Sequence, residues 1–147
     1  MIDKHKILIL DFGSQYTQLI ARRIREIGTF SEVRPSSISI KDITNINPSG
    51  IILSGGPETV TSIKSQKVDK SLFDLNIPIL GICYGMQTIA NELGGSVVSS
   101  DIREFGHAKI SNVNKSLLFN NVSFDSNSLD VWMSHGDKVN EIPNNFE

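Results

Sequence analysis

Three short apolar runs, each ending at a turn of small residues, limit most strongly what this chain can fold into. They are KILILD at residues 6–11, GIILSGG at residues 50–56 and IPILGIC at residues 77–83. Continuous apolar runs of this length are typical of strands buried on both faces, as in a parallel sheet. A further short strand is expected at residues 30–33, followed by a polar loop.

The segments between these runs have the spacing of helices. Residues 14–28 can start at a Ser14 cap and stop at Gly28, with three late arginines on a solvated face. Further helices are predicted at residues 65–75 and 84–95, and the alternation indicates a doubly wound parallel sheet with right-handed crossovers. The apolar stripe expected on the first helix consists of Tyr16, Leu19, Ile20, Ile24 and Ile27.

The last third of the chain has a different pattern, because apolar and polar residues alternate there without intervening helices. The segments SVVSS, EFGHAKISNV and SLDVWMSH each predict β structure. We expect them to form antiparallel strands appended to the parallel sheet.

Length and charge narrow the classes of protein further. A chain of 147 residues suits one domain, and a net charge of −2 offers no field for nucleic acid or an anionic membrane. The apolar run near the N-terminus is too short for a signal peptide or a membrane span, and one cysteine cannot form an internal disulfide. The sequence has no Cys/His cluster for a metal, and the expected location is cytoplasmic.

The single cysteine lies in GICYG, residues 81–85, which has the G-x-S-x-G form of a nucleophile elbow with cysteine in place of serine. A nucleophile at a sharp strand-to-helix turn has unfavourable backbone angles, so small residues are needed two positions before and after it. Cys83 would stand at a helix N-terminus, whose dipole favours a thiolate. The Tyr84 amide would point at a developing oxyanion, and the glycine loop at residues 55–57 could supply a second donor.

A lone cysteine is more often a small buried hydrophobe, but the strand, the helix and the second glycine loop favour a nucleophile here. Such a thiol needs a base, and the chain has three histidines. His5 precedes the first strand, at the wrong end of the sheet, and His107 lies in a β segment. His135 has Asp137 nearby, but a carboxylate two residues along rarely orients the ring, so we do not expect His135 to be the base.

Several segments together resemble the class I glutamine amidotransferase family, and within it the glutaminase domains of the GMP synthetases. LGICYGMQ is typical of the whole family, whereas DFGSQYTQLIARR and WMSHGD indicate the guanylate branch. IILSGGPETV and EFGHAKI also match, so the resemblance follows the family's order over nearly the whole chain. It implies a flavodoxin-like sheet with a glutaminase site at the cysteine.

By this resemblance Cys83 attacks the carboxamide of glutamine, forms a glutamyl thioester and releases ammonia. The resemblance assigns the oxyanion amides to Gly56 and Tyr84. Further positions match residues that border the glutamine pocket of the family: Gly55, Gln87, Ser134, Gly136 and Asp137.

The resemblance also implies partners outside residues 1–147. The family's catalytic histidine and glutamate lie in an H-P-E segment that this chain lacks, so residues 1–147 are expected to be a C-terminally incomplete amidotransferase domain of poor activity alone. An ATP-pyrophosphatase domain, on the same chain or on a separate subunit, would use ATP and Mg²⁺ to aminate XMP to GMP, and the parent is expected to be a homodimer. Two other interpretations stay open: a DJ-1/PfpI-like cysteine hydrolase, and a non-catalytic module that docks on a synthetase.

Overall fold

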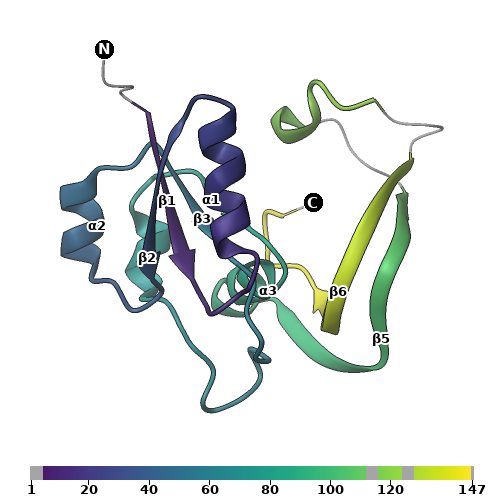
Figure 1. The fold of residues 1–147 in the computed structure, drawn as a ribbon. Coiled ribbons are helices and arrows are strands. Elements are labelled where there is room, and N and C mark those ends of the chain that lie inside the picture. The colour runs from purple at the N-terminus through teal and green to yellow at the C-terminus, as the bar shows by residue number, and fades with distance from the viewer. Residues whose placement is uncertain (1–4, 112–115, 124–127, 147) are drawn as a thin grey trace. The chain divides into compact units, whose positions relative to one another are not determined.

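The computed structural model describes residues 5–111, 116–123 and 128–146 (Figure 1). The chain divides into two compact units. The first unit comprises Met1–Ser99 and Asp137–Glu147, and the second comprises Ser100–Gly136.

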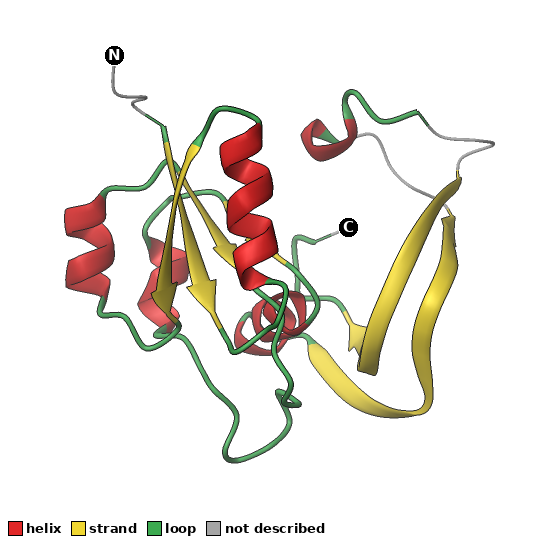
Figure 2. Cartoon of the chain, in the orientation of Figure 1, coloured by secondary structure: helices red, strands yellow, loops and turns green. Residues whose placement is uncertain are grey.

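The first unit is built on a four-stranded parallel sheet (Figure 2). Its strand order is β2-β1-β3-β4, and Ile9 at the centre of β1 pairs with Val33 on one side and Ile52 on the other. This confirms the predicted mostly parallel sheet. The strands are β1 (Lys6–Asp11), β2 (Phe30–Pro35), β3 (Gly50–Leu53) and β4 (Ile79–Gly81).

Helices cover both faces of this sheet. Leu8 and Leu10 belong to a buried cluster that includes Ile43 of α2 (Ile40–Ile46), Leu72 of the 3₁₀ helix η1 (Lys70–Asp74) and Ala90 of α3 (Tyr84–Glu92). Successive side chains of a strand point to opposite faces, so the intervening residue of β1 faces the other side. There α1 (Thr17–Glu26) contacts β1 and β2. This is the doubly wound arrangement predicted from the alternating pattern.

The apolar stripe predicted for α1 was wrong in part. Thr17 and Ala21 are the buried residues of the helix, whereas Tyr16, Leu19 and Ile27 are 53%, 45% and 81% exposed. The small side chains let the helix axis approach the sheet, so the buried face is shifted from the one that the larger apolar residues suggested.

The cap expected at the start of α1 is wrong, whereas the stop expected at Gly28 is confirmed. Ser14 does not cap the helix: its hydroxyl accepts the Tyr16 N–H at 3.0 Å, and the helix begins only at Thr17. Gly28 does end it, with φ +87° and its N–H donating to the Arg25 carbonyl, while the next N–H reaches back to Ile24. These two bonds form a Schellman motif, which explains the stop at glycine.

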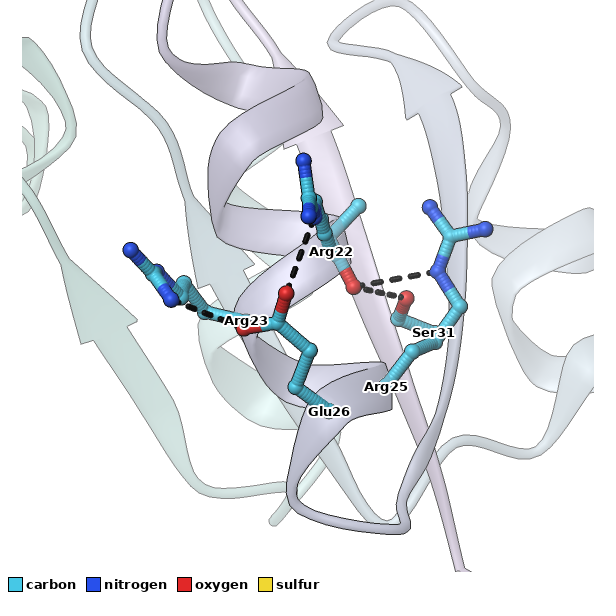
Figure 3. Close-up of polar contacts among 6 residues, drawn as sticks. Arg22, Arg23, Arg25, Glu26 and Ser31 are labelled. Carbon is cyan, nitrogen blue, oxygen red and sulfur yellow. Dashed lines mark hydrogen bonds and ion pairs between the residues drawn. The ribbon is translucent and has the colours of Figure 1, made fainter.

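The three arginines of α1 are exposed, and Figure 3 shows the polar contacts that they make. Arg22 and Arg23 both bind Glu26, at 2.9 and 2.8 Å, and their hydrogen bonds lower the pKa of that carboxyl. Arg25 instead donates through Nε to the Ala21 carbonyl, which also accepts the Ser31 hydroxyl of β2. The hydrogen bonds of the three arginines therefore all lie within α1, and Arg25 shares its acceptor with Ser31 of β2.

Two elements differ from the sequence prediction. The segment expected as a polar loop contains α2, whose N-cap Ser39 accepts the Asp42 N–H at 3.1 Å and whose C-cap Asn47 is left-handed with φ 50°. The helix expected over residues 65–75 is only the short 3₁₀ helix η1, which begins after the Asp69 cap. Residues 54–69, which connect β3 to η1, therefore contain no regular helix or strand.

The remaining strands form a separate two-stranded antiparallel sheet, as predicted. They are longer than the sequence segments suggested: β5 is Ser96–Ser111 and β6 is Ser128–Glu141, while the predicted positions 112 and 113 lie outside the described residues. Within the second unit, His107 Nε2 lies 3.1 Å from the Asp130 carboxylate, and Trp132 packs edge-on against the same ring. In the part of the chain that the structure describes, no helix is long and apolar enough to cross a bilayer.

Candidate active site

Cys83 lies between β4 and α3 in a strained backbone conformation, with φ 50° and ψ −109°. A non-glycine residue with positive φ in such a region costs about 1–3 kcal/mol and persists only where the surroundings enforce it. Here Ile82 N–H is tied to the Leu53 carbonyl of β3, and the Cys83 carbonyl accepts the first helical bond, from Gln87. The turn therefore has the sharp geometry that GICYG predicted.

The two flanking glycines are required by their close neighbours. A Cβ at position 81 would lie 2.6 Å from the Met86 nitrogen, and a Cβ at position 85 would overlap the carbonyl of Leu53. Both obstacles are backbone atoms, which cannot move aside as the end of a flexible side chain can. The prediction that small residues must lie two positions before and after Cys83 is thus confirmed.

Two loops from neighbouring strands meet at this turn. A Cβ built on Gly55, after β3, would lie 3.7 Å from the Cβ of Cys83 and 3.4 Å from the hydroxyl oxygen of Ser14, after β1. The fold places all three at the carboxyl ends of β1, β3 and β4, at the switch point where doubly wound sheets bind ligands. Ser14 was expected as a cap of the following helix, and its place directly after the buried strand β1 puts it at this edge of the sheet.

Ser54 holds the glycine loop in position. Its buried hydroxyl accepts the Phe12 N–H at 3.2 Å and donates to the Gly55 carbonyl at 2.9 Å. Its own carbonyl accepts the Gly85 N–H at 3.1 Å. One residue therefore connects the ends of β1 and β3 with the start of α3, a role that the local sequence around Ser54 did not indicate.

The two backbone N–H groups that were expected to bind an oxyanion, those of Gly56 and Tyr84, have free hydrogens in the part of the chain that the structure describes. Among the described residues, neither the Gly56 nor the Tyr84 N–H has an acceptor, whereas the Gly85 N–H is bonded to backbone carbonyls. A Cβ on Gly56 would lie 2.9 Å from the Phe12 carbonyl oxygen and 3.3 Å from Cγ of Tyr84. Gly56 and Tyr84 are therefore in contact.

Burial raises the pKa of the Cys83 thiol. The N-terminus of α3 acts in the opposite direction, because its dipole stabilises a negative charge. Desolvation is the cause of the raised pKa, so burial favours the protonated form of Cys83. The thiol therefore needs a proton acceptor to react near neutral pH.

The structure brings together only some of the residues that were expected to border the glutamine pocket. Gln87 is buried on α3, and its Nε2 donates to the backbone carbonyl of Asp137 at 3.1 Å, so these two residues are brought together. Gly136 lies on β6 in the second unit, and the side chain of Ser134 lies outside the described residues.

The histidines can be placed in part. His5 lies 3.5 Å from the Ser49 hydroxyl at the amino end of the sheet, away from the carboxyl ends of the strands as expected. His107 lies on β5 and pairs with Asp130, a carboxylate partner that sequence reasoning did not find. The side chain of His135 is outside the described residues.

The family model for class I glutamine amidotransferases matches residues 8–147. The chain belongs to this family, which is the class that the parallel sheet and the cysteine elbow define.

Two curated relatives of the chain are glutamine-hydrolyzing GMP synthases. The chain is 55% identical over 150 residues to a glutamine-hydrolyzing GMP synthase of Pseudomonas putida strain W619, and 56% identical to one of Tolumonas auensis. Each alignment covers 99% of this chain and 29% of the relative, so the chain spans less than a third of the length of these proteins.

Solved structures agree with this assignment. A candidate GMP synthase subunit from Thermoplasma acidophilum superposes with a TM-score of 0.79 at 31% identity, covering 95% of this chain and 69% of that one. A glutamine amidotransferase from Thermotoga maritima superposes with a TM-score of 0.70 at 21% identity, covering 95% and 64%, and supports the fold alone.

Proposed function

We propose that this chain is the glutaminase part of a GMP synthetase, which releases ammonia from glutamine for the ATP-dependent amination of XMP to GMP. The observation that carries the proposal is the strained Cys83 elbow beside the Gly55 loop. The family assignment and the GMP synthase relatives support glutamine as the substrate and a synthetase as the partner.

In the proposed reaction the thiolate of Cys83 attacks the carboxamide carbon of glutamine, forming a C–S bond. The resulting oxyanion accepts the N–H groups of Gly56 and Tyr84, and each such donor typically contributes a factor of roughly 10² to 10³ in rate. The intermediate collapses when the C–N bond breaks and the nitrogen takes a proton, which releases ammonia. Water then hydrolyses the thioester, yielding glutamate and the free thiol.

Both steps need a group that moves protons. The raised pKa of Cys83 makes a base necessary for attack, and the departing nitrogen needs an acid. We infer that a histidine and a glutamate outside residues 1–147 serve this purpose, so that residues 1–147 turn over glutamine poorly by themselves. ATP and Mg²⁺ would belong to the synthetase part, and no residue of this chain is assigned to them.

The glutamine pocket would lie where Gln87 approaches Asp137, close to the elbow on α3. Gly55, which borders Cys83, would close its other side. Ser134 and Gly136, on the second unit, remain predictions from the sequence.

The experiment is labelling of the thiol with a glutamine analogue that carries a chloroketone in place of the carboxamide. Cys83 is the only cysteine of residues 1–147, so mass added to the peptide that contains it reports this one site. We expect one equivalent of label, protection by glutamine, much weaker protection by asparagine, and no label in C83S. Label that glutamine does not prevent would favour another cysteine hydrolase, and absence of label would favour a docking module.

Activity of residues 1–147 alone is measured separately, as ammonia released from glutamine. Turnover far below that of the full-length protein is the expected result. Turnover close to that of the full-length protein would contradict the inference that the base lies outside this segment.

A further inference from the structure

Tyr84 follows Cys83 directly and is 3% exposed. The ring packs against Phe12 with centroids 5.1 Å apart, at an angle of 50°. Its hydroxyl donates to the backbone carbonyl of Gln66 at 2.7 Å. The side chain therefore reaches from the elbow to a residue in the long connection between β3 and η1.

That connection, residues 54–69, contains no regular helix or strand. Irregular loops of this length are uncommon in compact domains and are usually either functional or disordered. Val60 and Val68 are buried, and the Ser65 hydroxyl donates to the Val60 carbonyl at 3.3 Å. The loop is thus anchored at defined points, although Ile63 between them is fully exposed.

Gln66 connects the long loop with α3 and with the segment that follows β2. Its carbonyl accepts the Tyr84 hydroxyl, and its side-chain Oε1 accepts the Ser36 hydroxyl at 2.9 Å. The Ser36 N–H in turn donates to the carbonyl of Asp11, the last residue of β1. The far end of the loop is therefore held to α3 and to the end of β1.

Tyr84 also contacts the near end of the same loop. Gly56 approaches the Tyr84 ring so closely that a Cβ there would lie 3.3 Å from Cγ. One side chain thus touches the loop at Gly56 through its ring and at Gln66 through its hydroxyl. Residues 56–66 form an arch with both ends on Tyr84.

We propose that Tyr84 is a positioning residue whose hydroxyl and ring together fix residues 56–66 against α3, and so aim the Gly56 N–H at the oxyanion that the Tyr84 N–H also binds. The oxyanion rests on the proposed function, whereas the holding of the loop does not. A donor contributes fully only at about 2.7–3.1 Å from the oxyanion, so a small displacement of Gly56 weakens it.

The chemistry of the hydroxyl suits this role. Burial raises the pKa of the Tyr84 phenol, so it stays protonated and remains a donor through the neutral range. A neutral phenol bonded to a carbonyl adds no charge beside Cys83.

The test compares Y84F with Y16F in the full-length protein. Tyr16 is the only other tyrosine of residues 1–147 and is 53% exposed, so Y16F is a matched loss of one hydroxyl. We measure amide exchange over residues 57–66, ammonia release from glutamine, and alkylation of Cys83 by iodoacetamide.

In Y84F we expect several-fold faster exchange in the loop, kcat lower by about tenfold, and KM for glutamine changed less than about twofold. Iodoacetamide alkylation should stay near the wild-type rate, because the thiol itself is untouched. Y16F should match the wild type in all three. Unchanged loop exchange in Y84F overturns the proposal, and so does faster exchange with unchanged kcat.

A second variant separates the loop from the elbow. S36A removes the hydroxyl that holds Gln66 but leaves Tyr84 intact, so loop exchange should rise and kcat should fall in the same direction by a smaller factor. If the wild-type protein releases no ammonia from glutamine, the proposed function fails. The exchange of residues 57–66 in Y84F then decides by itself whether Tyr84 holds the loop.

Discussion

Gly85 of α3 lies directly on the carbonyl of Leu53 at the end of β3: a Cβ at position 85 would overlap this group. The Gly85 N–H donates to the next carbonyl, that of Ser54, at 3.1 Å. The first turn of the helix is thereby fixed against a neighbouring strand, and Cys83, two residues earlier, is held in its strained conformation.

We therefore expect G85A to destabilise the fold and to displace the thiol. Overpacking of a tight site typically costs about 1–3 kcal/mol, and a backbone obstacle should bring the loss to the upper part of that range. The matched control is G28A, where φ is +87° but nothing lies within 4 Å of the added Cβ, so that roughly 1–2 kcal/mol of backbone strain is the expected loss. Urea unfolding measures both, and equal losses would contradict the close contact at Leu53.

Ser54 provides a second test, because its hydroxyl is the acceptor of the buried Phe12 N–H. In S54A this donor is left without a partner, which typically costs about 1–3 kcal/mol. Labelling of Cys83 by the glutamine chloroketone should also slow, since the Gly55 carbonyl loses its donor. S37A, at an exposed serine, should change the unfolding free energy by less than about 0.5 kcal/mol. A stable S54A would show that water replaces the hydroxyl.

The strands could be predicted from the sequence because their signal is local. The bounds of β1 agree with the run KILILD, whose central residues Leu8, Ile9 and Leu10 are buried. The elbow was predictable for the same reason. Gly81 and Gly85 flank the cysteine within five residues, and their spacing implies the backbone geometry.

One contact that depends on strand order, between Ser14 and Gly55, was not predicted. Ser14 and Gly55 come together only because β1 and β3 are neighbours in the sheet, which no local pattern shows. The short helix α2 was missed because it is polar on most faces, although Ser39 with Asp42 three residues later is the pattern of a helix start. The buried face of α1 was misplaced because Thr17, a small polar residue, packs where larger apolar ones were expected.

The raised pKa of the Cys83 thiol predicts how stability depends on pH. The unfolded thiol ionises near its ordinary pKa of about 8.5, whereas burial keeps the folded thiol protonated to higher pH. The unfolded state therefore binds fewer protons above that pH, and this contribution to the unfolding free energy is complete below it and lost as pH rises towards the folded pKa.

Urea unfolding at about pH 7 and about pH 9.5, on either side of the ordinary thiol pKa, tests this dependence. The wild type should lose more stability between the two than C83S, which has no thiol to ionise. The pKa of Tyr84 is also raised, and Y84F with C83S separates the two groups. A wild type and C83S with the same pH dependence would contradict the raised pKa of this half-buried thiol.

Gln87 carries the last prediction, because it serves both the fold and the proposed pocket. Its Nε2 donates to the Asp137 carbonyl at 3.1 Å, and its Oε1 has no partner among the described residues, so it is free to accept a substrate donor. In Q87M, which keeps the length of the side chain, we expect the unfolding free energy to fall by about 1–2 kcal/mol and KM for glutamine to rise. Q18M, on the exposed face of α1, is the control and should change neither. Unchanged stability would show that the bond to Asp137 contributes nothing in solution, and lower stability with unchanged KM would remove Gln87 from the pocket and leave it a purely structural link between α3 and β6.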